Sequence, residues 1–342
     1  MPRYLEALKK ELAWVGSRAG RPLQTLYLGG GTPSLIAEED LLSLFAVLDT
    51  FFPRLPGAEV TLEANPDDVT PAKARLWRKL GINRVSLGVQ SFADKILELL
   101  GRRHDGQQAE RALATLLEAG FVVSCDLMLG LPSLTADLLF ATLKRLVRLA
   151  PHHISVYLLE MDKPHRLVAL AQRRPDLFPS DEEAARQYLG ASAFLRRQGY
   201  CHYEISNFAL PAFRARHNLR YWLGGVVFAC GVAASGQGHR SRWGNTDDFV
   251  AYLEALEQGR WPRAWHYRLS EEQAKAERVM LQLRLARGAP MSLVAEVAGF
   301  RPAFSRRVDD FITAGLARVH KQRLQLFPRG WLLSNELFAT LV

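Results

Sequence analysis

A repeated layout constrains this chain more than any other feature of its sequence. Between residues 26 and 160, short apolar segments recur, and each ends in glycines or in a polar residue. Segments of this length and composition predict β-strands. The expected strands lie near residues 24–28, 58–63, 84–89, 122–128, 153–158 and 201–206, and the first five end at residues 29–33, Glu63, Gln90, Asp126 and Tyr157.

Small polar residues are predicted to share one face of these strands. Successive side chains of a strand point to opposite faces, so residues two apart lie together. A β/α barrel that places its chemistry at the C-terminal ends of its strands shows this pattern. Cys125 is expected on the opposite face from Asp126. The predicted inner-face sets are Thr61 with Glu63, Ser86 and Gly88 with Gln90, Ser124 with Asp126, and Ser155 with Tyr157.

Stretches with helical periodicity separate the expected strands, at about residues 38–50, 71–80, 107–119, 135–149 and 181–198. This alternation implies parallel strands joined by right-handed crossovers. The first element, residues 2–15, reads as an amphipathic helix with no strand before it. We therefore expect an α/β fold with a partial β/α barrel that lacks its first strand.

The character of the sequence changes after about residue 265. A helix capped by Ser270, helices near residues 291–298 and 303–314, and a hairpin over residues 316–327 predict a small winged-helix-like domain. Arg301, Arg306 and Arg307 would suit a DNA-reading helix, but we favour docking on the barrel and expect no nucleic-acid partner. The expected domains are a barrel over residues 1–225, a connecting segment packing on it over 226–265, and the C-terminal domain over 266–342.

Composition sets modest limits. The 342 residues carry a net charge of +9, which suits ligands that bear propionate or phosphate groups, or nucleic acid. No apolar run reaches the ~20 residues that span a bilayer, which leaves only peripheral membrane association open. The N-terminus lacks the apolar core of a signal peptide, so we expect a cytoplasmic protein. Three cysteines do not form a disulfide framework.

The glycine run at residues 29–31 has two interpretations. Three glycines after a strand often mark only a tight turn. The run lacks the spacing of a dinucleotide-binding motif or of a P-loop. Alternatively, the backbone amides of Gly30 and Gly31 bind an anion or a carboxylate ahead of the helix that follows.

Ordered motifs then identify a resemblance. They are LYLGGGTPS at residues 26–34, EANP at 63–66, GINRVSLGVQSF at 81–92, LGRRH at 100–104 and DLMLGLP at 126–132. This set resembles the radical S-adenosylmethionine enzymes related to oxygen-independent coproporphyrinogen III oxidase. YEISNFA at 203–209 and HNLRYW at 217–222 are similar to the heme chaperone branch, which is HemW-like. The resemblance runs nearly end to end.

The resemblance implies a radical-SAM-type barrel that binds S-adenosylmethionine across its mouth. The glycine amides would hold the amino-carboxylate end, while carboxylates would accept from the ribose hydroxyls and the ammonium group. Arg103 is adjacent to Arg102, so an alignment shifted by one residue is the alternative at this position. The binding residues implied are Gly30, Gly31, Thr32, Glu63, Gln90, Arg102 and Asp126.

The chain departs from the family at its [4Fe-4S] cluster. The family binds this cluster through cysteines spaced Cys-x3-Cys-x2-Cys, and thiolates are the usual cluster ligands. Here the only cysteines are Cys125, Cys201 and Cys230, too far apart for that motif. We therefore expect no metal site in the chain as written and assign no catalytic residue. Either the sequence begins after the cysteine segment or the protein has lost the cluster.

His217 is the candidate heme ligand. A single histidine is more often a solvated or hydrogen-bonded side chain, but this one precedes Tyr221 and Trp222 and has arginines at 214, 216 and 220. Imidazole ligates heme iron, aromatic rings pack on the macrocycle, and arginine pairs with propionates. The resembling branch implies heme contact for the same motif.

Two functional classes follow from the resemblance. The first is a chaperone that holds heme or a porphyrin and passes it to heme-accepting proteins. The second is a radical enzyme of porphyrin biosynthesis, of the oxygen-independent coproporphyrinogen III oxidase type. The motif at residues 217–222 and the missing cysteine triad favour the chaperone, and whether the chain is an enzyme stays open at this point.

Overall fold

The structure is a computed structural model that describes residues 2–162 and 166–341. The chain divides into two compact units. Unit one contains residues 1–31, 35–60 and 216–342, and unit two contains residues 32–34 and 61–215. The domain boundaries expected near residues 225 and 265 stay predictions.

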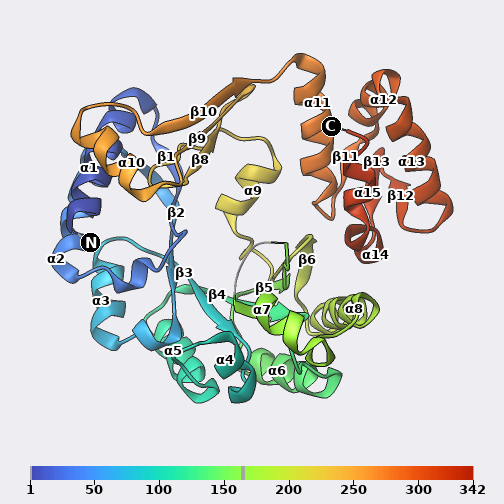
Figure 1. The fold of residues 1–342 in the computed structure, drawn as a ribbon, viewed down its shortest axis with the longest axis horizontal. Coiled ribbons are helices and arrows are strands. Elements are labelled where there is room, and N and C mark those ends of the chain that lie inside the picture. The colour runs from blue at the N-terminus through green and yellow to red at the C-terminus, as the bar shows by residue number, and fades with distance from the viewer. Residues whose placement is uncertain (1, 163–165, 342) are drawn as a thin grey trace. The chain divides into compact units, whose positions relative to one another are not determined.

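The largest sheet has seven strands in the order β1-β2-β3-β4-β5-β7-β6 (Figure 1). From β2 to β5 the pairing is parallel, as the alternation of strands and helices predicts. The bounds are β1 (Leu23–Leu28), β2 (Arg54–Ala64), β3 (Arg84–Gln90), β4 (Val122–Leu129), β5 (His153–Leu158), β6 (Cys201–Glu204) and β7 (Asn207–Ala209).

The register confirms the predicted inner face except at Gln90, where the pairing of β3 with β4 shifts and Gln90 lies beside Leu127. Glu63 lies beside Ser86, and Ser86 lies beside Ser124 on the next strand. Asp126 lies beside Ser155. Cys125 pairs instead with apolar neighbours on the opposite face and is fully buried. Inner-face side chains of the four adjacent strands β2 to β5 therefore lie beside one another, as the two-residue period of a strand predicts.

The segment at residues 201–206 differs from its prediction. It forms a hairpin in which β6 ends at Glu204 and β7 begins at Asn207, and β7 runs antiparallel to both β5 and β6. The single parallel strand predicted here is therefore wrong. The turn at Ile205 and Ser206 contains neither glycine nor proline, which are the strongest turn signals in a sequence.

Helices of unit two begin where capping residues predict. Thr70, Asp105 and Thr135 each accept a backbone N–H of the first turn, and Ser180 forms a capping box with Glu183. Their apolar faces bury side chains such as Leu113 against the sheet. The helices are α3 (Pro71–Lys79), α4 (Asp94–Leu100), α5 (Gly106–Glu118), α6 (Ala136–Arg148), α7 (Arg166–Arg173) and α8 (Asp181–Arg197).

Unit one begins on the predicted amphipathic helix, α1 (Pro2–Ala19), which packs against α2 (Glu38–Phe51) and α10 (Phe249–Glu257) (Figure 1). Unit one also contains the short helix α9 (Arg216–Trp222). An antiparallel sheet has the order β10-β9-β8, with bounds β8 (Ser235–Gln237), β9 (Ser241–Asn245) and β10 (Arg263–Arg268).

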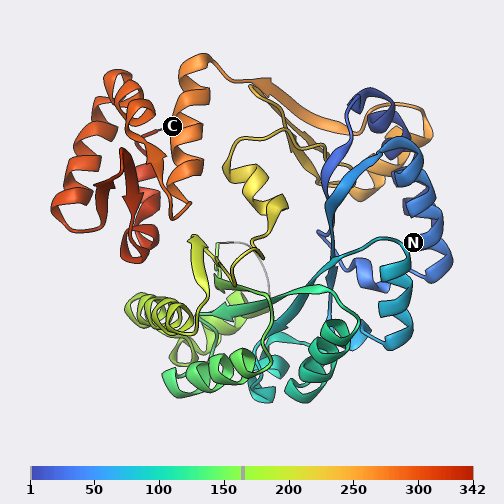
Figure 2. The ribbon, with the colours of Figure 1, turned by 180° about the vertical axis from the view of Figure 1, so that it is seen from behind.

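The C-terminal part contains the three helices and the hairpin that the sequence predicts, together with a short strand between the first two helices that was not predicted. Strands β11 and β12 both pair antiparallel with β13; Figure 2 shows this region in orange to red. Its elements are α11 (Glu271–Leu283), β11 (Ala289–Pro290), α12 (Met291–Phe300), α13 (Pro302–Thr313), β12 (Ala317–His320), β13 (Arg323–Leu326), α14 (Pro328–Leu332) and α15 (Ser334–Phe338). None of the helices in residues 2–162 and 166–341 is both long and apolar enough to cross a membrane.

Candidate functional site

Asp126 is the central acidic group on the inner face of unit two. Its carboxylate accepts a hydrogen bond from the Ser86 hydroxyl, with 3.1 Å between Oγ and Oδ2, and a second from Ser155. The residue keeps some contact with solvent, but desolvation raises the pKa of Asp126 to about 6. The two hydroxyls lower this pKa, and the negative charge of Glu63 raises it. Glu63 is therefore close enough to Asp126 for its charge to affect the pKa of Asp126.

Gln90 ends β3 in a strained backbone conformation. Its φ is +63°, a value that non-glycine residues rarely adopt and that is often found at binding sites. The Gln90 amide folds back over Gly88, where an added Cβ would lie 3.2 Å from Nε2 of Gln90 and 3.6 Å from Oδ1 of Asn65. The missing side chain at Gly88 thus makes room for two polar groups at the strand end.

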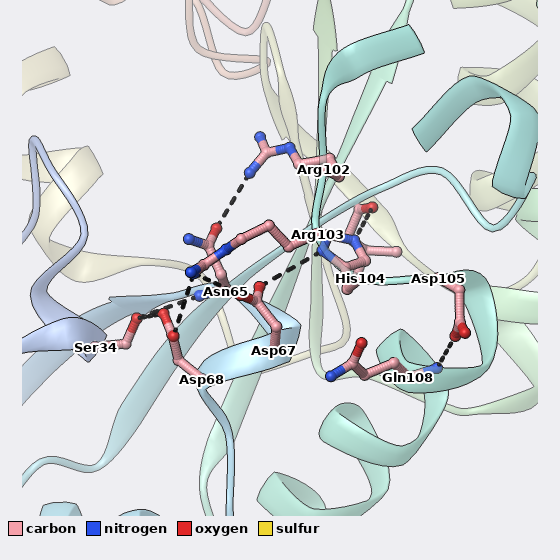
Figure 3. A network of polar contacts seen from close by, with 10 residues as sticks. Ser34, Asn65, Asp67, Asp68, Arg102, Arg103, His104, Asp105 and Gln108 are labelled. Carbon is pink, nitrogen blue, oxygen red and sulfur yellow. Dashed lines mark hydrogen bonds and ion pairs between the residues drawn. The ribbon is translucent and has the colours of Figure 1, made fainter. Parts of the chain in front are cut away.

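Arg102 extends this group of polar residues. Its Nη1 donates to Oδ1 of Asn65 at 3.1 Å, as Figure 3 shows. Its guanidinium is partly buried, which lowers its pKa, while Asp67 and Asp126 oppose that shift. Arg103 points elsewhere, because its Nη2 lies 2.5 Å from Oδ2 of Asp67. Of the two adjacent arginines, Arg102 is the one whose charge acts on Asp126.

The segment that contains Thr32 is fixed to unit two through Ser34. The buried Ser34 hydroxyl donates to Oδ2 of Asp68 at 2.7 Å, and Nζ of Lys73 donates to the Ser34 carbonyl at 2.8 Å. Gly30 and Gly31, which follow β1, belong to unit one and are exposed. Gly30 needs its glycine because its φ is +84°.

Two buried polar atoms add to the inner face. Oγ1 of Thr61 and Oδ1 of Asn207 have no hydrogen-bond partner within residues 2–162 and 166–341. Buried polar atoms usually have partners, so unpaired ones often mark a ligand position. The strand periodicity places Thr61 on this face. The sequence did not predict Asn207 on this face, because the expected strand over residues 201–206 ends before Asn207, where β7 begins.

His217 lies in unit one, at the start of α9, and is held against β1. Its Nδ1 lies 2.9 Å from the Thr25 hydroxyl. Its ring stacks on Tyr27, with ring centroids 5.0 Å apart and planes 22° apart. No residue in the described part of the chain forms a hydrogen bond with Nε2, and the ring is only partly buried. Nδ1 of His217 therefore contacts Thr25, whereas Nε2 is available to a ligand.

Glu59 of β2 fixes the backbone that carries this histidine. Its carboxylate accepts the backbone N–H groups of Arg216 at 3.1 Å and of His217 at 2.9 Å. These are N-terminal amides of α9, which favour a negative partner. Burial lowers the pKa of His217; the charge of Arg220 adds to this shift and that of Glu59 opposes it. The imidazole is therefore neutral at pH 7, which is the form that binds iron.

The aromatic and basic neighbours of His217 do not all face it. Tyr221 lies edge-on to the imidazole, with ring centroids 5.5 Å apart. Trp222 points away, toward Arg284, whose guanidinium carbon lies 5.4 Å from the centre of the Trp222 ring. Of the two aromatic residues, Tyr221 therefore lies beside the imidazole and Trp222 does not. Arg220 extends along β1 and donates to Gln24.

The cysteines do not form a cluster site. Cys125 is buried, Cys230 is partly buried and Cys201 is exposed. Within the described residues, no three His, Cys, Asp or Glu side chains are grouped to hold a metal ion. The side chains within residues 2–162 and 166–341 thus do not fit a [4Fe-4S] cluster.

Comparison with known proteins places the chain in a family. The heme chaperone HemW of Mycobacterium tuberculosis (strain CDC 1551 / Oshkosh) is 33% identical over 342 residues, covering 99% of this chain and 86% of that protein. The heme chaperone HemW of Bacillus subtilis (strain 168) is 31% identical, with 98% and 90% covered. The chain belongs to the HemW family.

Domain models and a solved structure agree with this membership. The model of the Radical SAM superfamily matches residues 2–146, and that of the HemN C-terminal domain matches residues 269–333. Coproporphyrinogen III oxidase (HemN) from Escherichia coli, described as a radical SAM enzyme, superposes with a TM-score of 0.87 over 99% of this chain and 82% of that one. At 22% identity this likeness shows the fold alone. It confirms the predicted partial radical-SAM-type barrel of this HemW-family chain.

Proposed function

We propose that this chain is a heme chaperone: it binds heme and passes it to heme-accepting proteins. Its curated relatives in M. tuberculosis and B. subtilis carry that name. The observation that carries the proposal is the neutral His217 imidazole, with Nδ1 at the Thr25 hydroxyl and Nε2 available. A neutral imidazole nitrogen is the usual protein ligand of heme iron.

The surroundings of His217 suit a macrocycle with acidic substituents. Tyr221 offers an apolar ring edge beside the imidazole. Beyond α9, the large apolar side chains of Leu223, Val226 and Phe228 are exposed in the same unit, at 42%, 40% and 38%. Arg220 and the net charge of +9 favour a ligand that carries propionates. Release to an acceptor requires that the ligand remain accessible, and a partly buried histidine meets that need.

We further propose that the inner face of unit two contributes to an S-adenosylmethionine site. Glu63 and Asp126 would accept from hydroxyl and ammonium groups, Gln90 offers both a donor and an acceptor, and Arg102 would lie beside them. Unpaired Thr61 and the strained Gln90 support a ligand at this face. Thr32, Gly30 and Gly31 are proposed for the amino-carboxylate end on the motif alone. In the superfamily, S-adenosylmethionine supplies radical chemistry when it is bound together with a reduced cluster.

The coproporphyrinogen oxidase alternative receives support from the fold alone. The cysteines within the described residues do not fit a cluster, which favours the chaperone over the oxidase.

A transfer assay tests the chaperone proposal. The chain is loaded with one equivalent of heme, freed of excess, and mixed with an apo-heme protein such as apomyoglobin. We expect the Soret spectrum of the loaded chain to be replaced by that of the acceptor. A chain that takes up no heme, or that keeps it in the presence of excess acceptor, contradicts the proposal.

A further inference from the structure

The side chains that hold His217 come from one face of β1. Thr25 and Tyr27 are two residues apart, so both point to the same side of that strand. Thr25 meets the imidazole at Nδ1, and Tyr27 stacks on its ring. The imidazole is therefore fixed both in its plane and at one of its two nitrogens.

The contact at Nδ1 bears on which nitrogen carries the ring proton. In a neutral imidazole one nitrogen donates and the other accepts. When Nδ1–H donates to the Thr25 hydroxyl oxygen, the lone pair on Nε2 is directed outward. Histidines that bind metals almost always donate their other N–H to such a partner, which fixes the tautomer and makes the ligating nitrogen more basic.

We infer that Thr25 is a positioning residue for His217: its hydroxyl accepts the Nδ1 proton and so presents Nε2 to the iron of heme. This inference rests on the proposed function. Glu59 acts in the same arrangement, because it holds the backbone amides of Arg216 and His217 while Thr25 orients the ring. Thr25 itself does not touch the iron.

The substitutions Thr25→Val and Thr25→Ser separate the hydroxyl from the rest of the side chain. Valine keeps the shape but removes the acceptor, and serine keeps the acceptor. We expect Thr25→Val to weaken heme binding about tenfold or more, as loss of an outer partner of a ligating histidine does. We expect the reduction potential of bound heme to rise, because a less basic imidazole stabilises ferric iron less. Thr25→Ser should restore both values.

A matched control and a direct measurement complete the test. Thr115→Val removes a hydroxyl that donates to the Arg111 carbonyl within α5, and it should change neither heme affinity nor potential. In the unliganded wild type, ¹⁵N NMR should show His217 protonated at Nδ1. This measurement does not depend on whether Thr25→Val folds.

The outcomes distinguish the inference from the proposed function. If His217→Ala abolishes heme binding while Thr25→Val matches the wild type in affinity and potential, the inference about Thr25 is overturned and the chaperone proposal survives. A His217 ring protonated at Nε2 in the unliganded chain also overturns the inference. If His217→Ala binds heme as the wild type does, the proposed ligand itself is wrong.

Discussion

Glu11 of α1 accepts a hydrogen bond from the Tyr252 hydroxyl of α10, with 2.7 Å between Oε2 and the hydroxyl oxygen. Both side chains are almost completely buried. The same carboxylate accepts from the Gly231 backbone N–H at 2.7 Å and from Nδ2 of Asn245 at 2.6 Å. Three donors from three segments therefore converge on one carboxylate and fix α1 to the rest of unit one.

Replacing Glu11 should destabilise the protein strongly. Glu11→Ala leaves the three donors buried without an acceptor, so we expect the free energy of unfolding to fall by about 3 kcal/mol or more. Glu6→Ala is the matched control, because Glu6 is exposed on the same helix and pairs with Lys9; the change in its free energy of unfolding should stay within about 0.5 kcal/mol. Urea unfolding measures both. Equal effects of the two substitutions would contradict the structural role of Glu11.

Glu11 should also give stability a pH dependence. Burial raises the pKa of Glu11 above its usual range. The folded state therefore holds this proton more tightly than the unfolded state, and stability falls as the pH rises from the ordinary carboxyl pKa through the raised one. In Glu11→Gln this contribution is absent. We expect the difference between wild type and Glu11→Gln, measured by urea unfolding, to change across that window; a constant difference would count against the raised pKa.

Binding of S-adenosylmethionine should depend on the ionisation of Asp126. The pKa of Asp126 is raised to about 6, chiefly by desolvation. A carboxyl group binds hydroxyl and ammonium donors more strongly when it is charged, so affinity should fall as the pH drops through 6. Calorimetric titration between pH 5 and 8 would show this. Asp126→Asn should bind weakly at every pH, and a wild-type affinity unchanged between pH 5 and 8 would argue against a role for Asp126.

The adjacent arginines offer a matched pair. Arg102 is partly buried and reaches Asn65, whereas Arg103 is 63% exposed at its side chain and pairs with Asp67. We expect Arg102→Gln to weaken S-adenosylmethionine binding about tenfold, or about 1.4 kcal/mol. Arg103→Gln should have little effect, because an exposed ion pair contributes little. The reverse order would show that the motif is aligned one residue out of place.

The strand periodicity predicted most of the inner face because it depends only on local geometry. Glu63, Ser86, Ser124 and Asp126 share that face as the two-residue period requires. The sequence did not predict the left-handed backbone conformation of Gln90, because the surrounding structure imposes that conformation. Strand β10 was missed because all six of its residues are exposed, so it lacks the alternation of buried and exposed positions.

Helix geometry explains why the surroundings of His217 were predicted only in part. Residues four apart on a helix share a face, so Tyr221 meets the imidazole. Trp222 lies five residues after His217 and therefore points to a different side of α9. Thr25 and Glu59 were not predicted because they lie 192 and 158 residues from His217 in the chain, and only the packed fold brings them together.

A heme titration of the wild type and of His217→Ala, followed by Soret absorbance, tests the central claim most directly. His320→Ala is the matched control, because His320 is exposed on β12. Arg220→Ala should cost less than His217→Ala, since a propionate contact near solvent is partly screened. We predict that His217→Ala shifts the Soret band and weakens binding at least tenfold, or about 1.4 kcal/mol, while His320→Ala matches the wild type. Unchanged affinity and an unchanged Soret band in His217→Ala would contradict the account.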